Sequence, residues 1–187
     1  MVKKVINEEN GEILHKIENE EEQRTLKVTA GLHGSTEIFA EESFNKISSV
    51  YNMYAGPFNT FSIGSDLTPS MTKTVLVPAI ANAKNWYVIK LSNGLMIKCG
   101  PSTMFLTSVD KRYIVVEQLK VGTELCEVTY DISSNNIIIG KTTIELIEFV
   151  ESPIGEPAYY FINETKNMML PAYNKDKNTI SFVNIMQ

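Results

Sequence analysis

The chain has 187 residues, a formal net charge of −5 and an isoelectric point near 5.2, so its bulk charge argues against binding to nucleic acids or anionic membranes. A hydrophobic content of 43% and a charged content of 21% are ordinary for one globular domain with a full core, with or without a short arm. No apolar run approaches the length of a membrane span, and the N-terminal residues lack the apolar core of a signal peptide. We therefore expect a cytoplasmic protein that is not secreted.

The N-terminal residues differ in sequence pattern from the rest of the chain. Residues 3–17 have the pattern of a small hairpin that turns at Asn10-Gly11, and residues 18–22 form an acidic run typical of a solvated linker. A lone hairpin is marginally stable in water, so this one needs a surface to lean on. We interpret residues 1–29 as an N-terminal arm with an acidic linker, and residues 30–187 as a β domain.

The rest of the chain reads as a succession of short strands. Glycine, proline and asparagine separate runs of β-forming residues, and hardly any sustained helical period is present. We expect an all-β domain in which residues 55–70 form a surface loop. The expected strands are 26–30, 47–54, 75–80, 86–91, 95–99, 113–116, 125–130, 137–139, 143–150, 159–162 and 179–183.

The strongest local signal is Asn93-Gly94, which stands between two runs of β-forming residues. This pair is typical of a two-residue type I′ hairpin turn, because both central residues need a positive φ angle. Gly100-Pro101 then ends the second strand, since proline has no N–H to donate to a neighbouring strand. The sequence returns to apolar residues at Phe105-Leu106.

This arrangement resembles the Hint domain of inteins and hedgehog autoprocessing proteins. In that family the segment is a hairpin around Asn-Gly followed by Cys-Thr-Pro-x-His-x-Phe-Leu-Thr. The resemblance implies a Hint-type fold of short curved strands with pseudo-twofold symmetry, without an inserted endonuclease. Blocks similar to those of the family occur in the right order at residues 31–38, 90–107, 119–125, 156–162 and 180–184.

The residues at the family's catalytic positions lack the chemistry that self-processing requires. Gly31 stands where a Cys or Ser nucleophile begins the domain, and Thr103 replaces the histidine that protonates the departing amide nitrogen. Tyr160 replaces an aspartate that tunes proton movements, and Val183 replaces the histidine that assists asparagine cyclisation. Only Asn184 retains the family residue. The resemblance therefore implies a fold whose active centre has been lost.

These substitutions favour a catalytically inactive Hint-like domain that serves as a structural or interaction subunit of a larger assembly. Because Hint domains occur in phage genes, the family analogy suggests a virion component, present in the host cytoplasm or the virion. The expected partners are other protein subunits, in a homo- or hetero-oligomer, with no cofactor and no metal. The alternative is a self-processing protein with residual autocleavage at Asn184. A small-molecule binding module is a third option, without a constellation of residues that supports it.

Two other groups of residues are candidates for sites. Cys99 and Cys126 are too few for a disulfide framework or a zinc site, and both stand in apolar runs, which favours buried free thiols. His33, Ser35 and Asp66 supply the residue types of a hydrolase triad. Nothing in the sequence brings these three together, and no nucleophile-elbow motif accompanies them.

Aromatic residues gather in the segment expected to be a loop. Exposed aromatics in a loop are typical of contact surfaces, so we predict an interface there. Met168-Met169-Leu170, by contrast, is an apolar run that we expect in the core or an interface. The candidate interface residues are Tyr51, Tyr54, Phe58 and Phe61.

Overall fold

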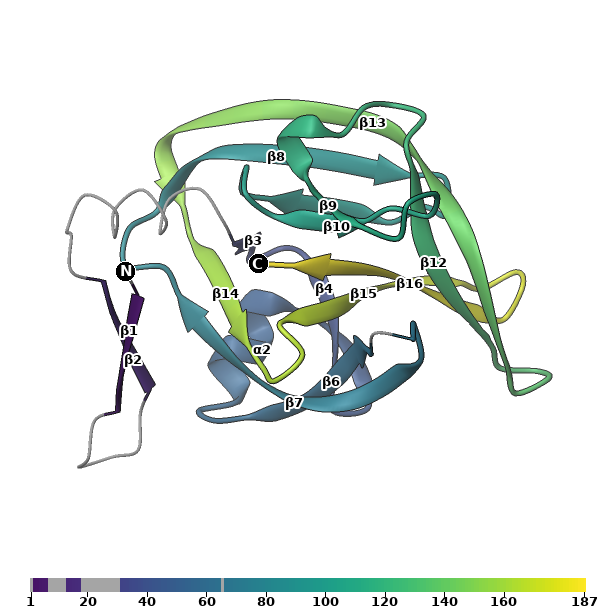
Figure 1. The fold of residues 1–187 in the computed structure, drawn as a ribbon, viewed down its shortest axis with the longest axis horizontal. Helices are drawn as coiled ribbons and strands as arrows, with labels where there is room; N and C mark the ends of the chain where they lie inside the picture. Colours follow the sequence, from purple (N-terminus) through teal and green to yellow (C-terminus); the bar gives the residue numbers. More distant parts are fainter. Residues whose placement is uncertain (1, 7–12, 18–30, 65) are drawn as a thin grey trace.

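The computed structural model describes residues 2–6, 13–17, 31–64 and 66–187, and most of these residues lie in β-strands (Figure 1). Among the described residues, helical structure is limited to α2 (Ile47–Met53) and the 3₁₀ turn η1 (Val116–Gln118). The all-β class expected from the sequence is confirmed. The strands are β1 (Val2–Ile6), β2 (Ile13–Ile17), β3 (Leu32–His33), β4 (Glu37–Ala40), β5 (Ser43–Lys46), β6 (Phe58–Ile63), β7 (Pro69–Pro78), β8 (Ala83–Leu91), β9 (Met96–Cys99), β10 (Met104–Leu106), β11 (Tyr113–Val115), β12 (Glu124–Asp131), β13 (Asn136–Glu156), β14 (Ala158–Ile162), β15 (Asn167–Asn174) and β16 (Thr179–Met186).

A single long strand joins the two halves of the structure. β13 pairs with β12 through residues 136–143 and with β8 from Ile144 onward, and Figure 1 shows it arching along β8. All strand pairs in the described part of the chain are antiparallel. The described residues form a 12-stranded sheet in the order β11-β10-β16-β12-β13-β8-β9-β3-β14-β7-β6, with β15 beside β16, and separate pairs β1-β2 and β4-β5.

The core is apolar and lies between the strongly curved strands. Its main cluster includes Leu32, Ile97, Phe105 and Ile185, each with no exposed surface. A second cluster forms around Met169 and the side chains near it. The predicted burial of residues 168–170 is confirmed, because all three are almost fully buried. Removal of these side chains from water supplies the main driving force for folding.

The hairpin predicted at Asn93-Gly94 is present, but its turn differs from the prediction. β8 and β9 pair antiparallel, with Tyr87 opposite Cys99 at one end and Lys90 opposite Met96 at the other, as expected. The N–H of Leu91 donates to the carbonyl of Leu95 (3.0 Å), so the connection comprises residues 92–94 rather than the Asn-Gly pair alone. Gly94 has a φ of +89°, whereas Asn93 instead accepts the N–H of Leu95 with its side-chain oxygen (3.0 Å). The asparagine therefore stabilises the turn through its side chain, in a longer hairpin loop.

Two expected elements are wrong and one is incomplete. Residues 47–54 were expected as a strand but form α2, because Ile47 and Val50 lie one turn apart and both face the core. The expected loop at 55–70 contains β6, whose alternate residues are buried. Residues 137–139 and 143–150 belong to one continuous strand, β13, rather than to two.

The predicted N-terminal arm is described only in part. β1 and β2 pair antiparallel, with Val2 opposite Ile17, as the hairpin interpretation expects. The turn at Asn10-Gly11, the acidic run and the expected strand at 26–30 lie outside the described residues, so the domain boundary after residue 29 stays a prediction. Within the ranges described, no helix is long and apolar enough to cross a membrane.

Candidate functional site

Gly31 and Thr103 meet at a buried junction between the start of β3 and the start of β10. The carbonyl oxygen of Gly31 accepts the N–H of Gly100 at 2.8 Å and the hydroxyl of Thr103 at 3.4 Å. Gly31 has a φ of +115°, a conformation that favours glycine. A Cβ atom added there would lie 3.3 Å from the Cβ of Ala158 and 3.3 Å from the carbonyl oxygen of Tyr159. The backbone at this position is therefore closely adapted to glycine.

The thiol beside this junction is not reactive at neutral pH. Cys99 is fully buried and hydrogen-bonds with the side chain of Thr103, but burial raises the pKa of Cys99 to about 12. Because the thiolate is the nucleophile, such a group is inert near pH 7. Cys126 is also buried, and both cysteines are free thiols, as predicted.

The last residues of β16 reach the same junction. Met186 lies opposite Met104, the residue after Thr103, so position 187 is level with Thr103. The side-chain oxygen of Gln187 accepts the N–H of Phe161 at 3.2 Å. The side-chain nitrogen of Gln187 is buried and has no hydrogen-bond partner among the described residues. Sequence reasoning missed Gln187, because its position depends on the register of β16 against β10.

Two of the three remaining family positions, Val183 and Asn184, do not join this junction. Val183 is a buried core residue, and Asn184 points to the opposite face of β16, as alternation along a strand requires. Tyr159 and Phe161 pack on the core, so Tyr160 between them faces away from it, and burial raises the pKa of Tyr160 to about 12. The resemblance to the Hint family predicts Asn184 at the catalytic centre. The register of β16 against β10 instead places Gln187 level with Thr103.

Asn184 belongs to a separate network of buried amides. Its side-chain nitrogen donates to Asn167 (2.8 Å) and to the carbonyl of Met168 (3.3 Å), and its oxygen accepts the hydroxyl of Tyr113. Asn167 in turn accepts the N–H of Ile63 (3.0 Å) and donates to the carbonyl of the same residue (3.0 Å). These side-chain hydrogen bonds connect β6, β15 and β16.

Solved structures with this architecture identify the fold. An intein from a hyperthermophile matches with a TM-score of 0.60 and 12% identity, over 84% of this chain and 99% of that chain. The DnaB intein from Synechocystis matches with a TM-score of 0.59 and 16% identity, over 83% and 99% of the two chains. The chain has the Hint fold. A bacterial intein-like domain from Clostridium thermocellum also matches, with a TM-score of 0.57 and 14% identity, over 85% and 99%.

These likenesses concern the Hint fold alone, because the identities are low. No protein-family model matches the chain, and no curated protein matches its sequence. On this Hint fold the junction offers a threonine hydroxyl, a carboxamide and a protonated thiol. None of these groups titrates near neutral pH.

The predicted aromatic interface is only partly at the surface. Phe58 is 2% exposed and belongs to the core, so the prediction is wrong for this residue, which β6 turns inward. Tyr54 is half-buried and stacks on Phe58, with ring centres 5.8 Å apart. Tyr51 on α2 is 39% exposed and contacts the ring of Tyr159 (5.4 Å). It lines a hollow of about 460 Å³ that α2 shares with β7.

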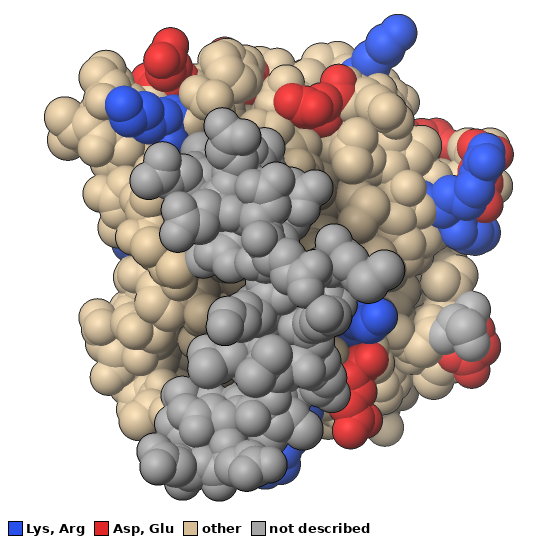
Figure 2. All heavy atoms as spheres, turned by 60° about the vertical axis from the view of Figure 1, so that its left-hand side comes forward, with Lys and Arg blue, Asp and Glu red and all other residues tan. Residues whose placement is uncertain are grey.

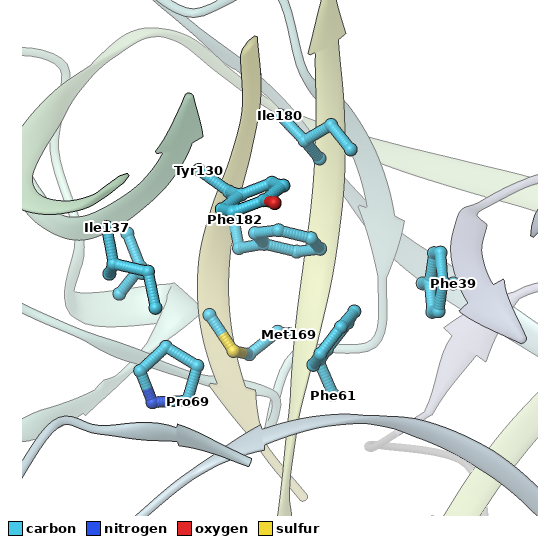
Figure 3. Close-up of a pocket in the computed structure, with 9 residues that line it drawn as sticks. Phe39, Phe61, Pro69, Tyr130, Ile137, Met169, Ile180 and Phe182 are labelled. Atoms are coloured by element: carbon cyan, nitrogen blue, oxygen red, sulfur yellow. The ribbon is translucent and has the colours of Figure 1, made fainter. Parts of the chain in front are cut away.

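Phe61 lies instead in an apolar pocket of about 310 Å³ (Figure 3). The pocket is walled on one side by Phe39 and Phe61 and on the other by the sheet formed by β13, β12 and β16. The only hydroxyl of the lining, on Tyr130, donates to Asn135 (2.5 Å). The residues that line the pocket are Phe39, Phe61, Pro69, Val128, Tyr130, Ile137, Met169, Ile180 and Phe182.

Charged side chains do not gather into a patch on the face shown in Figure 2. Basic and acidic residues of the described chain are interspersed there among uncharged surface. Across the described ranges, no group of three or more His, Cys, Asp and Glu side chains could hold a metal ion.

The residues weighed as a hydrolase triad separate into two places. Asp66 caps the turn between β6 and β7, where its carboxylate accepts the N–H (3.0 Å) and the hydroxyl (2.8 Å) of Thr68. His33 and Ser35 do meet, and the carboxylate that joins them is Glu156. Sequence reasoning missed Glu156, since it stands far from His33 in the chain.

Proposed function

We propose that this chain is a Hint-fold domain that does not process itself and that serves as a structural or interaction subunit of a larger assembly. The observation that carries the proposal is the geometry of Gly31. A residue with a side chain would be strained at its φ angle and crowded by Ala158 and Tyr159, so the position is built for glycine and not for a nucleophile. The hydroxyl of Thr103, the carboxamide of Gln187 and the thiol of Cys99 at this junction supply no acid or base near neutral pH.

The alternative function, autocleavage at Asn184, is disfavoured by the surroundings of that residue. Cleavage by cyclisation requires the side-chain nitrogen of Asn184 to attack the backbone carbonyl carbon of the same residue, so that the peptide bond to Ile185 breaks and its nitrogen leaves as the amine. The carboxamide is held by Asn167 and Tyr113, and β16 is paired on both sides at Ile185, with β10 and with β15. Both restraints would have to break before the bond could form.

The intact mass of the purified protein tests the absence of self-processing. After prolonged incubation at neutral pH, with and without dithiothreitol, we expect the mass of one uncleaved chain in both samples. Thiols cleave thioesters, and Gly31 cannot form one. A fragment ending at Ala30 or at Asn184 that accumulates within hours would contradict the proposal.

The assembly role predicts partner chains that bind through the surface of α2. Tyr51 and Met53 are 39% and 56% exposed there, an apolar contribution typical of interfaces. Protein purified gently from its native source should carry other chains at constant stoichiometry, and Tyr51→Ser should reduce their amount about tenfold. Tyr173→Ser, at an exposed tyrosine on β15, is the matched control and should leave it unchanged. Equal recovery in both variants would exclude this surface as the interface.

The specific form of assembly that we propose is a phage particle, and it rests on the family analogy alone. In that case the chain should be present in purified virions at a fixed copy number.

A further inference from the structure

Ser35, His33 and Glu156 form a continuous hydrogen-bonded group on the outer face of β3. The side-chain oxygen of Ser35 lies 2.6 Å from Nδ1 of His33, and Nε2 of His33 lies 2.7 Å from a carboxylate oxygen of Glu156. The preceding residue, Leu32, points into the core, so His33 points outward. We call this group the Ser35–His33–Glu156 relay.

The neighbouring backbone assigns the protonation state of the imidazole. The N–H of Ser35 donates to Nδ1 of His33 (3.1 Å), so Nδ1 is an acceptor and the ring proton is on Nε2, facing Glu156. The hydroxyl of Ser35 must therefore donate to Nδ1. This is the order of donors in a serine–histidine–carboxylate triad, with the two ring nitrogens exchanged.

The surroundings hold the imidazole neutral and in place. Burial lowers the pKa of His33 below its usual value near 6.5, and Lys98 lowers it further, while Glu156 opposes both. A neutral imidazole at pH 7 can accept a proton. The ring also packs edge-on against buried Trp86 (5.2 Å), and Glu156 is bound by Lys98 and by the side chain of Ser152.

We propose that Ser35 is a surface nucleophile for small activated carboxylic esters, with His33 as its general base and Glu156 as a positioning residue. Ser35 is exposed, so a substrate can reach its hydroxyl. Activated esters are the fitting class because an open surface site gives little electrostatic stabilisation to the transition state, and the leaving group must be a stable anion.

The reaction balances without any group beyond water. The oxygen of Ser35 attacks the ester carbonyl, a C–O bond forms, and the bond to the leaving alcohol or phenol breaks. The proton of Ser35 passes to Nδ1 of His33 and then to the leaving group or solvent. Water, activated by the same nitrogen, then hydrolyses the acyl-serine and returns the hydroxyl.

Acylation by p-nitrophenyl acetate tests the proposal, read by peptide mass spectrometry of the full chain. The acetyl group should appear on Ser35, and Ser35→Ala should abolish that adduct. His33→Gln should slow the labelling of Ser35 about 100-fold. Ser43 is the matched control, because it is exposed and its oxygen accepts the side-chain nitrogen of Asn45 (2.7 Å) rather than facing a histidine. Ser43→Ala should leave the labelling of Ser35 unchanged.

The pH profile separates a reactive group from a merely structural one. Labelling of wild-type Ser35 should rise with pH and level off above a midpoint below 6.5, where His33 loses its proton. Glu156→Gln should lower the plateau about tenfold and move the midpoint to lower pH, because Glu156 raises the pKa of His33. Labelling of Ser35 at the rate of Ser43, or without this pH dependence, would overturn the proposal. The pH dependence of Ser35 labelling in the wild-type protein tests the proposal even if a variant does not fold.

This inference is independent of the proposed function. Acylated protein remains one uncleaved chain, so esterase activity and self-processing give different masses. An acetyl adduct on Ser35 without chain cleavage would support both proposals, and cleavage without the adduct would contradict both.

Discussion

Gly31→Cys is expected to lower the free energy of unfolding by about 2–4 kcal/mol and to restore no cleavage. The cysteine supplies the missing thiol, but its backbone must keep a φ of +115° and its Cβ must fit 3.3 Å from Ala158. Strain and crowding both act against the folded state. Denaturant unfolding measures the first effect, and intact mass after incubation with dithiothreitol measures the second.

Gly140→Cys is the control for the added thiol. Gly140 lies in β13 at a negative φ or extended conformation, and a Cβ added there meets no atom within 4 Å. Its replacement should change the stability by less than about 0.5 kcal/mol. If Gly31→Cys is as stable as this control, the backbone at position 31 is not specifically adapted to glycine. If Gly31→Cys is cleaved before residue 31 within hours, the junction is catalytically competent and lacks only a nucleophile.

Asn167→Ala is expected to cost about 3–5 kcal/mol, since it leaves several buried polar groups without partners. Asn167 is 5% exposed and satisfies the N–H and the carbonyl of Ile63 and the side chain of Asn184. Alanine can serve none of them. Urea unfolding monitored by tryptophan fluorescence measures the change, because Trp86 is the single tryptophan of the chain.

Asn174→Ala is the matched control on the same strand. Asn174 stands at the end of β15, and its side chain accepts only the N–H of Lys177 (3.1 Å) in an exposed turn, among the hydrogen bonds described. That loss should cost about 0.5–1 kcal/mol. If the two variants were equally stable, the amide network would not be what joins β6, β15 and β16.

The amino-acid sequence alone determined the features that depend on neighbouring residues. Asn93-Gly94 between runs of β-forming residues predicts the β8–β9 hairpin, because turn chemistry acts over a few positions. The sequence also shows, without coordinates, that Gly31 has no nucleophilic side chain and that Thr103 is not an acid. It shows the all-β class as well, since strand patterns and turn residues recur along the whole chain.

Local patterns failed where short segments fit more than one structure. Residues 47–54 carry β-forming residues, yet Ile47 and Val50 also have the spacing of a helical face, and burial against the core decided for the helix. The aromatic residues of β6 show the same limit, because Phe58 alternates into the core that other strands create.

Only the tertiary structure decided which distant residues meet. The register of β16 against β10 brings Gln187, and not Asn184, level with Thr103, and a shift of one residue would reverse which side chains face the core. Glu156 reaches His33 because β14, the strand that follows it, pairs with β3. Such contacts depend on strand pairing across the whole sheet, and no stretch of sequence contains that information by itself.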